Sequence, residues 1–280
     1  MNNTLPKLGW KKDEYDSRDK FLRFSSVNLD TLPKKVDLRE HCSTVENQTT
    51  LGSCTANAAA GALEYLEIKD GTVNDEFENF SRLFIYYNTR KIQNTIAVDT
   101  GATLRDTMIA LVEHGGCDER LWGYDVAKFA TQPPEDCYKN ASNHRITEYS
   151  RLSTLPDMLQ CLSDGFPFVF GFMVYPECMS PEVAKTGVLH LPKPGEVASG
   201  GHAVCAVGYD MESKTLLVRN SWGEGWGQGG YFTMPFEYIE NPSLAQDFWT
   251  IRKVEAKAVN KCSVINVILK LYRSIIGEKK

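Results

Sequence analysis

The sequence predicts an α+β fold whose first half is helical and whose second half is rich in β-strands. Helical spacing of apolar residues occurs in three early segments, residues 54–69, 80–90 and 103–114. Short β-type runs separated by Gly, Pro and Asp begin at residue 166. We therefore expect a helical lobe over about 32–150, a sheet-rich lobe over about 151–258, and a substrate cleft between them.

Local start and stop residues support the predicted helices. The Ala-rich segment that begins at Cys54 has high helix propensity and ends at Asp70-Gly71, and Ser81 can cap the aromatic-rich helix that follows. The third helix ends at Gly115-Gly116, and a short helix is expected over 155–162. Strands are expected over five runs, namely 166–175, the segment around His202, 215–219, 230–234 and 248–252.

The two ends of the chain lie outside these lobes. Residues 1–31 are polar, with Trp10, Phe21 and Phe24 as isolated aromatic residues, and are predicted to form an extended arm rather than a domain. Residues 259–280 include an apolar helical pattern that is too short and too charged to span a bilayer. A tail helix packed on the body is the simpler interpretation, with contact to a partner or a membrane surface as the alternative.

Cys54 is the first candidate catalytic residue. It follows a Gly-Ser pair and begins the Ala-rich helix, where unpaired N–H groups and the helix dipole favour a thiolate. His202, in an apolar strand, can act as its base, and Asn220 can fix the orientation of the imidazole. A lone cysteine or histidine in such surroundings is more often structural, so the inference depends on the combination.

The sequence around these three residues is more specific than the residues themselves. Cysteine, histidine and asparagine occur in that order, in the contexts N-Q-x-x-x-G-S-C, G-H-A-V-x-A-V-G-Y and R-N-S-W-G-x-G-W-G-x-x-G-Y. In these contexts the chain resembles the papain-like cysteine proteases of the broad cathepsin group. The resemblance implies a papain-like two-lobe peptidase domain over 32–258. It also implies cleavage of peptides or proteins through an acyl-enzyme intermediate, without a metal or organic cofactor.

Further residues take their expected roles from this resemblance. Gln48 matches the glutamine that binds the oxyanion together with the Cys54 N–H, and Trp222 matches the tryptophan that covers the Asn–His contact. Four more positions are expected to bind substrate: Gly101 and Ala102 through backbone pairing, and Gly171 and Ala203 at the border of a pocket for a bulky apolar residue two positions before the cut.

The sequence departs from the family pattern near the nucleophile and the histidine. Leu51 replaces a cysteine that forms a disulfide in secreted relatives, Thr55 replaces the usual aromatic residue, and Gly201 stands where several relatives carry a polar residue. The isolated histidines do not form a paired-histidine loop of the cathepsin B kind. Endopeptidase action is therefore expected, rather than removal of carboxy-terminal dipeptides.

Charge and cysteine content restrict the partners and the compartment. The net charge of −5 and the lack of a basic block give no electrostatic support for a nucleic-acid partner. The first fourteen residues show no signal peptide, and the eight cysteines show no metal-ligand spacing. With Cys54 as nucleophile, the remaining cysteines cannot all pair, so a reducing intracellular compartment is expected. A monomeric chain is a separate expectation.

Two alternatives to a peptidase remain open at this point. The chain could be a catalytically silent relative that binds peptides, or an acyl transferase or ligase that uses the same nucleophile. A separate hypothesis concerns residues 1–31, which could lie in or near the cleft and lower activity until the arm is displaced or cut.

Overall fold

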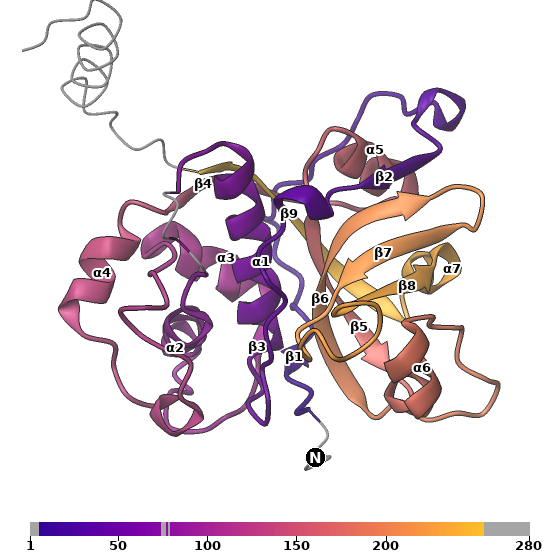
Figure 1. Cartoon of the computed structure of the whole chain (residues 1–280). Coiled ribbons are helices and arrows are strands. Elements are labelled where there is room, and N and C mark those ends of the chain that lie inside the picture. The colour runs from indigo at the N-terminus through magenta and orange to yellow at the C-terminus, as the bar shows by residue number, and fades with distance from the viewer. Residues whose placement is uncertain (1–5, 74–76, 78, 255–280) are drawn as a thin grey trace, which may run out of the picture.

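A helical lobe and an antiparallel β-sheet lie on either side of α1 (Cys54–Lys69) in the computed structural model (Figure 1). The structure describes residues 6–73, 77 and 79–254, so the predicted C-terminal tail lies outside the described residues. Within the described part of the chain, no helix is long and apolar enough to cross a membrane. The predicted α+β class is confirmed.

The helical lobe is built from segments with clear capping residues. Its helices are α1, α2 (Arg82–Ile92), α3 (Leu104–Glu113) and α4 (Glu135–Ala141). Ser81 caps α2 by accepting a hydrogen bond from the Phe84 N–H, and Thr103 caps α3 through the Asp106 N–H. The three predicted helices are confirmed to within two residues at each end, whereas α4 was not predicted.

The sheet-rich lobe is one antiparallel sheet of seven strands within the described residues. The strands are β2 (Lys35–Asp37), β4 (Ile146–Arg151), β5 (Phe168–Val174), β6 (Gly200–Asp210), β7 (Thr215–Arg219), β8 (Tyr231–Pro235) and β9 (Ala245–Val254). Their order is β4-β9-β5-β6-β7-β8, with β2 paired to β6 off this path. All five predicted strands are present, and three short helices surround them, α5 (Leu155–Ser163), α6 (Pro181–Thr186) and α7 (Phe236–Glu240).

Two short strands at the ends of the predicted helical lobe belong to the sheet. β2 pairs with β6, and β4 pairs with β9, so the chain crosses between the lobes after β2 and again before β4. Both strands are short, polar and only partly buried, so they lack the apolar pattern that identified the other strands. The predicted range of about 32–150 therefore describes the helical lobe only in its middle.

The N-terminal arm runs between the two lobes before it reaches β2 (Figure 1). Its first strand, β1 (Trp10–Lys11), pairs in parallel with β3 (Ala102–Thr103), which directly precedes α3. Phe21 then forms a backbone bridge with Arg151 at the end of β4. The described part of the arm is mostly without regular structure, ends in a short 3-10 helix at Leu29–Thr31, and contacts both lobes.

Arg219, at the end of β7, connects the sheet to α1. It passes so close to Gly61 that a Cβ added to this glycine would lie 2.8 Å from Arg219 Nε. Its Nη2 donates to the Thr44 carbonyl at 2.7 Å and to Ser43 Oγ at 3.0 Å, and lies 3.9 Å from the carboxylate of Glu64. Burial raises the pKa of Glu64, and the charge of Arg219 opposes this shift.

Replacing Arg219 by Met should destabilise the fold, because the variant leaves Glu64 buried without its principal cation. Loss of one partner of a buried ion pair lowers the free energy of unfolding by about 3–5 kcal/mol. The matched control is Arg18→Met, because Arg18 pairs with Asp16 through a side chain that is 88% exposed, and such surface pairs contribute little. Urea unfolding followed by tryptophan fluorescence is the measurement. Equal midpoints for the two variants would contradict the role given to Arg219.

Candidate active site

Cys54 is the first residue of α1 and is completely buried. Burial raises the pKa of its thiol to about 11, although the backbone N–H groups of Ala203, Gly9 and Thr55 act in the opposite direction. The N–H groups at the helix N-terminus favour the thiolate, as the sequence indicated. The loss of hydration of the buried sulfur has the larger effect and favours the thiol. In this arrangement the thiol is protonated at pH 7.

His202 lies on β6 and is held by Asn220, which follows β7. The Asn220 Oδ1 atom accepts from the Ser221 N–H at 2.8 Å and lies 2.8 Å from His202 Nε2, so Nε2 carries the proton that is donated to it. His202 Nδ1 is buried and has no hydrogen-bond partner among the described residues. Trp222 stacks on the imidazole with ring centroids 4.8 Å apart. Burial lowers the pKa of His202 to about 4, so the ring is neutral at pH 7.

Gln48 lies in the loop before α1 and is also completely buried. Its Oε1 accepts from Ser221 Oγ at 2.6 Å, which fixes the orientation of the amide. Its Nε2 donates to the carbonyl oxygens of Leu51 at 3.0 Å and Lys7 at 2.9 Å. The candidate oxyanion donor therefore already binds a carbonyl group of the arm. The sequence motifs did not identify Ser221 as a residue of the site. Its position directly after Asn220 was the indication that the sequence offered.

Ala102, which was predicted to pair with substrate, pairs here with the arm. Its N–H donates to the Gly9 carbonyl at 2.8 Å. A Cβ built on Gly101 would lie 2.1 Å from the same carbonyl oxygen, and the φ angle of Gly101 is 73°, so only glycine fits. The Gly101 N–H donates to the Tyr86 hydroxyl at 3.0 Å and is not available to the arm.

Trp10 of the arm fills the space beside Gly171 and Ala203, the two residues predicted to border a pocket. These residues lie opposite each other in the β5–β6 pairing. A Cβ added to Gly171 would lie 1.9 Å from Trp10 Cε2, and one added to Gly201 would lie 2.6 Å from Trp10 Cε3. A cavity of about 330 Å³ adjoins the indole and is also lined by Met173. The missing side chains at positions 171 and 201 thus make room for a large aromatic ring.

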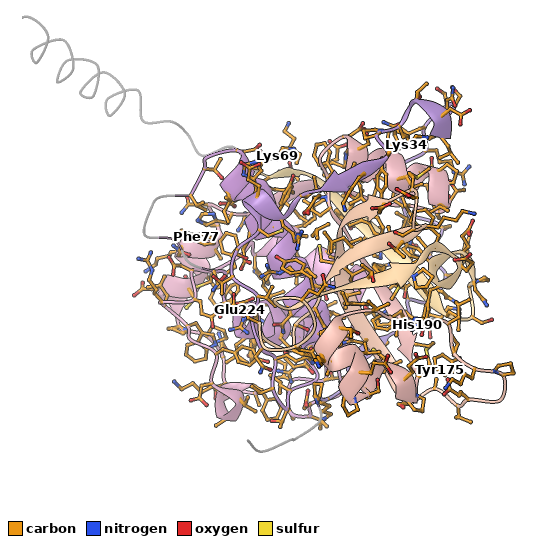
Figure 2. All side chains as sticks on the ribbon, turned by 45° about the vertical axis from the view of Figure 1, so that its right-hand side comes forward. Lys34, Lys69, Phe77, Tyr175, His190 and Glu224 are labelled. Carbon is orange, nitrogen blue, oxygen red and sulfur yellow. The ribbon has the colours of Figure 1, made fainter. Side chains whose placement is uncertain are left out.

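The structure brings the predicted catalytic residues together at the junction of the lobes. Ser221 contacts both Asn220 and Gln48. The contact with the Ala203 N–H places Cys54 beside β6, the strand that carries the histidine. Side chains from both lobes fill this junction (Figure 2). Cysteine, histidine, asparagine and glutamine in one buried site are the residue types that nucleophilic catalysis by a cysteine requires.

Comparisons with known proteins give the same class. The family model described as "Papain family cysteine protease" matches residues 32–248. An uncharacterised peptidase C1-like protein of Acanthamoeba polyphaga mimivirus is 40% identical to this chain over an alignment 279 residues long. The alignment covers 90% of this chain and 89% of that protein.

Solved structures give the same family and fold. The crystal structure of xylellain, a cysteine protease from Xylella fastidiosa, matches with a TM-score of 0.81 and 40% identity, over 88% of this chain and 96% of that one. Procathepsin B S9 from Trypanosoma congolense matches with a TM-score of 0.66 over 89% of this chain and 87% of that one. At 18% identity, this second match shows the fold alone.

The chain belongs to the papain family of cysteine proteases. It is a thiol protease that hydrolyses peptide bonds, and its substrates are peptides or proteins. The family resemblance and the activity inferred from the sequence are confirmed.

The arm should slow chemical modification of Cys54, because Trp10 and Gly9 exclude water and the buried thiol stays protonated. We expect Trp10→Ala in the full chain to raise the rate of Cys54 alkylation by iodoacetamide about tenfold, since reactivity follows the thiolate fraction. The matched control is Tyr15→Ala, because Tyr15 belongs to the same arm and is 94% exposed. Peptide mapping by mass spectrometry separates Cys54 from the other cysteines. Equal rates for the two variants would contradict shielding by the arm.

Proposed function

We propose that the chain is an endopeptidase whose own N-terminal arm holds the cleft closed. The observation that carries this proposal is the course of residues 7–10. The Lys7 carbonyl accepts from the amide of Gln48, and the Gly9 carbonyl accepts from the backbone of β3. The Trp10 ring fills the space beside Gly171. These are the three places that a substrate needs for its carbonyl group, its backbone and an apolar side chain.

In the open form, the Cys54 thiolate attacks the substrate carbonyl carbon while His202 Nδ1 holds the thiol proton. The tetrahedral oxyanion accepts hydrogen bonds from Gln48 Nε2 and the Cys54 N–H. When the carbon–nitrogen bond breaks, His202 gives its proton to the leaving amine and the acyl group stays on sulfur. A water molecule, deprotonated by His202, then releases the acid. Asn220 keeps Nε2 bonded, so that Nδ1 remains the atom that moves protons.

The arm contacts the nucleophile without offering it a bond to cut at Gly9. The Gly9 N–H faces the Cys54 sulfur, whereas the Gly9 carbonyl oxygen is bonded to the Ala102 N–H. Attack requires the carbonyl carbon in contact with the nucleophile and in the correct orientation. The contact therefore supports inhibition rather than self-cleavage at this residue.

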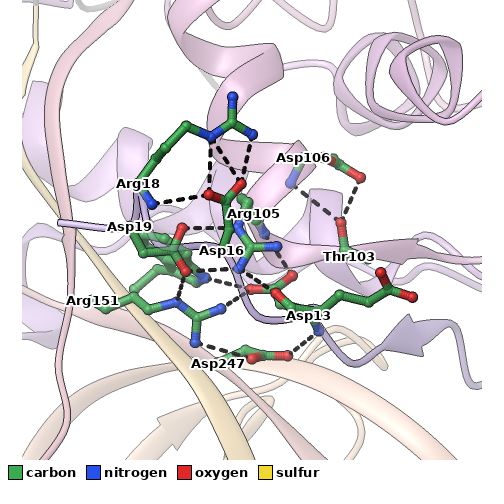
Figure 3. A network of polar contacts seen from close by, with 11 residues as sticks. Asp13, Asp16, Arg18, Asp19, Thr103, Arg105, Asp106, Arg151 and Asp247 are labelled. Atoms are coloured by element: carbon green, nitrogen blue, oxygen red, sulfur yellow. Dashed lines mark hydrogen bonds and ion pairs between the residues drawn. The ribbon is translucent and has the colours of Figure 1, made fainter. Parts of the chain in front are cut away.

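Charged side chains fasten the arm to both lobes just after β1 (Figure 3). The Asp13 carboxylate accepts from Arg151 Nη2 at 2.6 Å and from Trp249 Nε1 at 2.9 Å. Asp19 lies 2.7 Å from Arg105 Nη2 and 2.7 Å from Arg151 Nε. Because Arg105 belongs to α3 and Arg151 to β4, each lobe supplies one guanidinium group. The name arm clasp is used below for five residues, Asp13, Asp19, Arg105, Arg151 and Asp247.

Asp247 contributes to the arm clasp from an unusual backbone conformation. Its φ angle is 58°, and it lies at an irregularity in the pairing of β5 with β9. Its carboxylate accepts from the Asp13 N–H at 2.8 Å and from Arg151 Nη1 at 3.2 Å. A left-handed residue whose side chain binds a backbone N–H of the arm supports a dedicated arm-binding site.

The space around Trp10 supports a preference for a bulky apolar substrate residue two positions before the cut. Gly171, Gly201 and Ala203 leave this space free of large side chains, and the indole shows that an aromatic ring fits. Burial of a side chain of this size supplies binding energy through the hydrophobic effect.

We also infer a monomeric chain in a reducing compartment, without a nucleic-acid partner. All seven cysteines within the described residues are free, and six of them are buried. The net charge of −5 gives no attraction to nucleic acid. Sedimentation velocity tests the monomeric state, and a count of free thiols in the purified protein tests the reduced state of the cysteines.

Trp10→Ala should make the full chain a faster peptidase, because it removes the aromatic ring that fills the space beside Gly171. We expect kcat/KM on a fluorogenic peptide to rise about tenfold, because the fraction of molecules with an open cleft rises by the same factor. Tyr15→Ala is the control and should leave the rate unchanged. Adding Cys54→Ala to Trp10→Ala should abolish hydrolysis. Equal activity of the wild-type chain and Trp10→Ala would refute the closed-arm form.

Product analysis in the same assay separates the two alternative activities. Amide products that form only when an amine is added would identify an acyl transferase or ligase. Alkylation of Cys54 without any turnover by Trp10→Ala would identify a relative that binds peptides and does not cleave them.

The arm clasp should hold the arm more tightly in mild acid. Burial and the charge of Asp247 raise the pKa of Asp13 from 3.8 to about 6 in the closed form. A released arm exposes Asp13, whose pKa then returns to about 3.9. The closed form therefore gains stability below about pH 4 and loses this gain as the pH rises through about 6. Formation of the Cys54–His202 ion pair moves a proton within the site and adds no pH dependence over this range.

The measurement is the ratio of Cys54 alkylation rates in the wild-type chain and in Trp10→Ala, from about pH 5 to pH 8. Division by the second rate removes the intrinsic pH dependence of the thiol reaction. We expect the ratio to rise with pH, and to rise less in chains that carry Asp13→Asn. A ratio that falls as the pH rises would contradict the assignment to Asp13.

A further inference from the structure

The two proposed oxyanion donors stand at the two ends of the loop that leads into α1, at positions 48 and 54. The Gln48 amide is held by Ser221 of the sheet-rich lobe, and the Cys54 N–H belongs to the first turn of the helix. The loop between them contains Thr49, a β-branched residue whose φ angle is 53°. Such a residue is rarely left-handed, so contacts from outside the loop must stabilise this conformation.

Tyr124 contacts both ends of this loop through a single oxygen atom. It lies between α3 and the 3-10 helix η3 (Val126–Lys128). Its hydroxyl donates to the Gln48 carbonyl at 2.9 Å, and Ser53 Oγ lies 2.6 Å from the same hydroxyl. Because the carbonyl can only accept, the phenol proton belongs to that bond and Ser53 donates to Tyr124. The helical lobe thus joins the main chain of the glutamine to the residue before the nucleophile.

Ser53 uses its hydroxyl for this contact rather than for capping the helix. It stands at the N-cap of α1, where a serine hydroxyl commonly accepts from a backbone N–H, but within the described chain its side chain makes no such bond. Asn57 instead donates through Nδ2 to Ser53 Oγ at 3.0 Å and to the Ser53 carbonyl at 2.9 Å. Ser53 is completely buried. Its position between Asn57 and Tyr124 sets that of the Cys54 N–H, the next group of the chain.

The ring of Tyr124 is itself fixed by a cation. The guanidinium carbon of Arg82 lies 4.1 Å from the centroid of the ring. Arg82 lies 2.6 Å from the carboxylate of Glu46 and 2.7 Å from that of Glu119, so its place does not depend on the arm. Burial raises the pKa of Tyr124 to about 12, although the Ser53 hydrogen bond and the charge of Arg82 act in the opposite direction. The hydroxyl therefore keeps its proton at pH 7 and remains a donor.

We propose that Tyr124 is a positioning residue, which fixes the separation of the Gln48 amide and the Cys54 N–H through one shared hydroxyl group. The inference rests on the proposed role of Gln48 as an oxyanion donor. A misplaced donor weakens the hydrogen bond to the oxyanion of the transition state more than any contact with the bound substrate. Tyr124 therefore acts on the rate of the chemical step, and leaves substrate binding and the reactivity of the thiol unchanged.

The test compares Tyr124→Phe with Tyr138→Phe, both in the full chain that carries Trp10→Ala. Each change removes one phenol oxygen from the helical lobe and keeps the ring. Tyr138 of α4 donates to Asn88 of α2 at 3.1 Å, which makes it the matched control. We expect Tyr124→Phe to lower kcat on a fluorogenic peptide about tenfold at an unchanged KM. Tyr138→Phe should change neither value.

Two further readouts separate positioning from a loss of structure. The rate of Cys54 alkylation by iodoacetamide should be equal in the two Phe variants, because the sulfur displaces iodide and no carbonyl group is attacked. Ser53→Ala breaks the same bridge from the other side without removing a helix cap, and should lower kcat by a similar factor. A higher KM or slower alkylation in Tyr124→Phe would show a structural role only and would overturn the inference.

A double variant shows whether Tyr124 acts through Gln48. Gln48→Ala in the same chain should lower kcat about 100-fold, as expected for the loss of one oxyanion donor. Adding Tyr124→Phe to it should then cost less than the single change does, because one of the two groups that the hydroxyl positions is already gone. Losses that multiply in full would mean that the two residues act independently, which contradicts the inference.

Gln48→Ala also separates this inference from the proposed function. A large loss of kcat in Gln48→Ala with no loss in Tyr124→Phe would support the proposed endopeptidase and overturn the role of Tyr124. An unchanged kcat in Gln48→Ala would contradict the proposed oxyanion donor and the role of Tyr124 together, while the peptidase activity itself would stand. No hydrolysis by the Trp10→Ala chain would contradict the proposed function and this inference with it.

Discussion

Burial of the Cys54 thiol and the His202 imidazole is the constraint on which the closed form depends. Both groups are completely buried, and burial favours the neutral state of each. A cysteine at a helix N-terminus beside a base would otherwise favour the thiolate and imidazolium. Access of water to the cleft therefore sets the protonation state of the site. In the proposed function, the arm, which lies between the lobes, limits that access.

The arm forms ion pairs with both lobes, so both lobes contribute to the closed form. Arg105 from the helical lobe and Arg151 from the sheet meet the same Asp19, so any separation of the lobes weakens the arm clasp. The hydrogen bonds of the arm each contribute about 0.5–1.5 kcal/mol, and their sum must stay small enough for release. Asp13 and Asp247 are the least favourable part, because two carboxylates share one buried site. Repulsion between these two carboxylates therefore lowers the stability of the closed form.

Local patterns in the sequence were sufficient where local forces decide the structure. The cap at Ser81 and the glycines after residues 70 and 114 indicated where helices begin and end, and the motifs around Cys54, His202 and Asn220 gave the predicted catalytic set. The course of the arm could not be predicted in this way, because the Asp13 N–H bonds to a carboxylate 234 residues away. The protonation state of Cys54 was missed for the same reason, since desolvation by the arm is a long-range effect. Strands β2 and β4 likewise form only because longer strands are present beside them.

In the proposed closed form, the direction in which the arm runs explains why it is not cut at Gly9. In the proposed reaction, the apolar residue of a substrate comes before the carbonyl group that Gln48 binds, whereas in the arm the Lys7 carbonyl group on Gln48 comes before Trp10. A chain that fills the same two places in the opposite order must run in the opposite direction. Its peptide groups are then reversed, so an N–H meets the Cys54 sulfur where a substrate presents a carbonyl carbon. The same two places can therefore hold the arm in the proposed closed form and a substrate during cleavage.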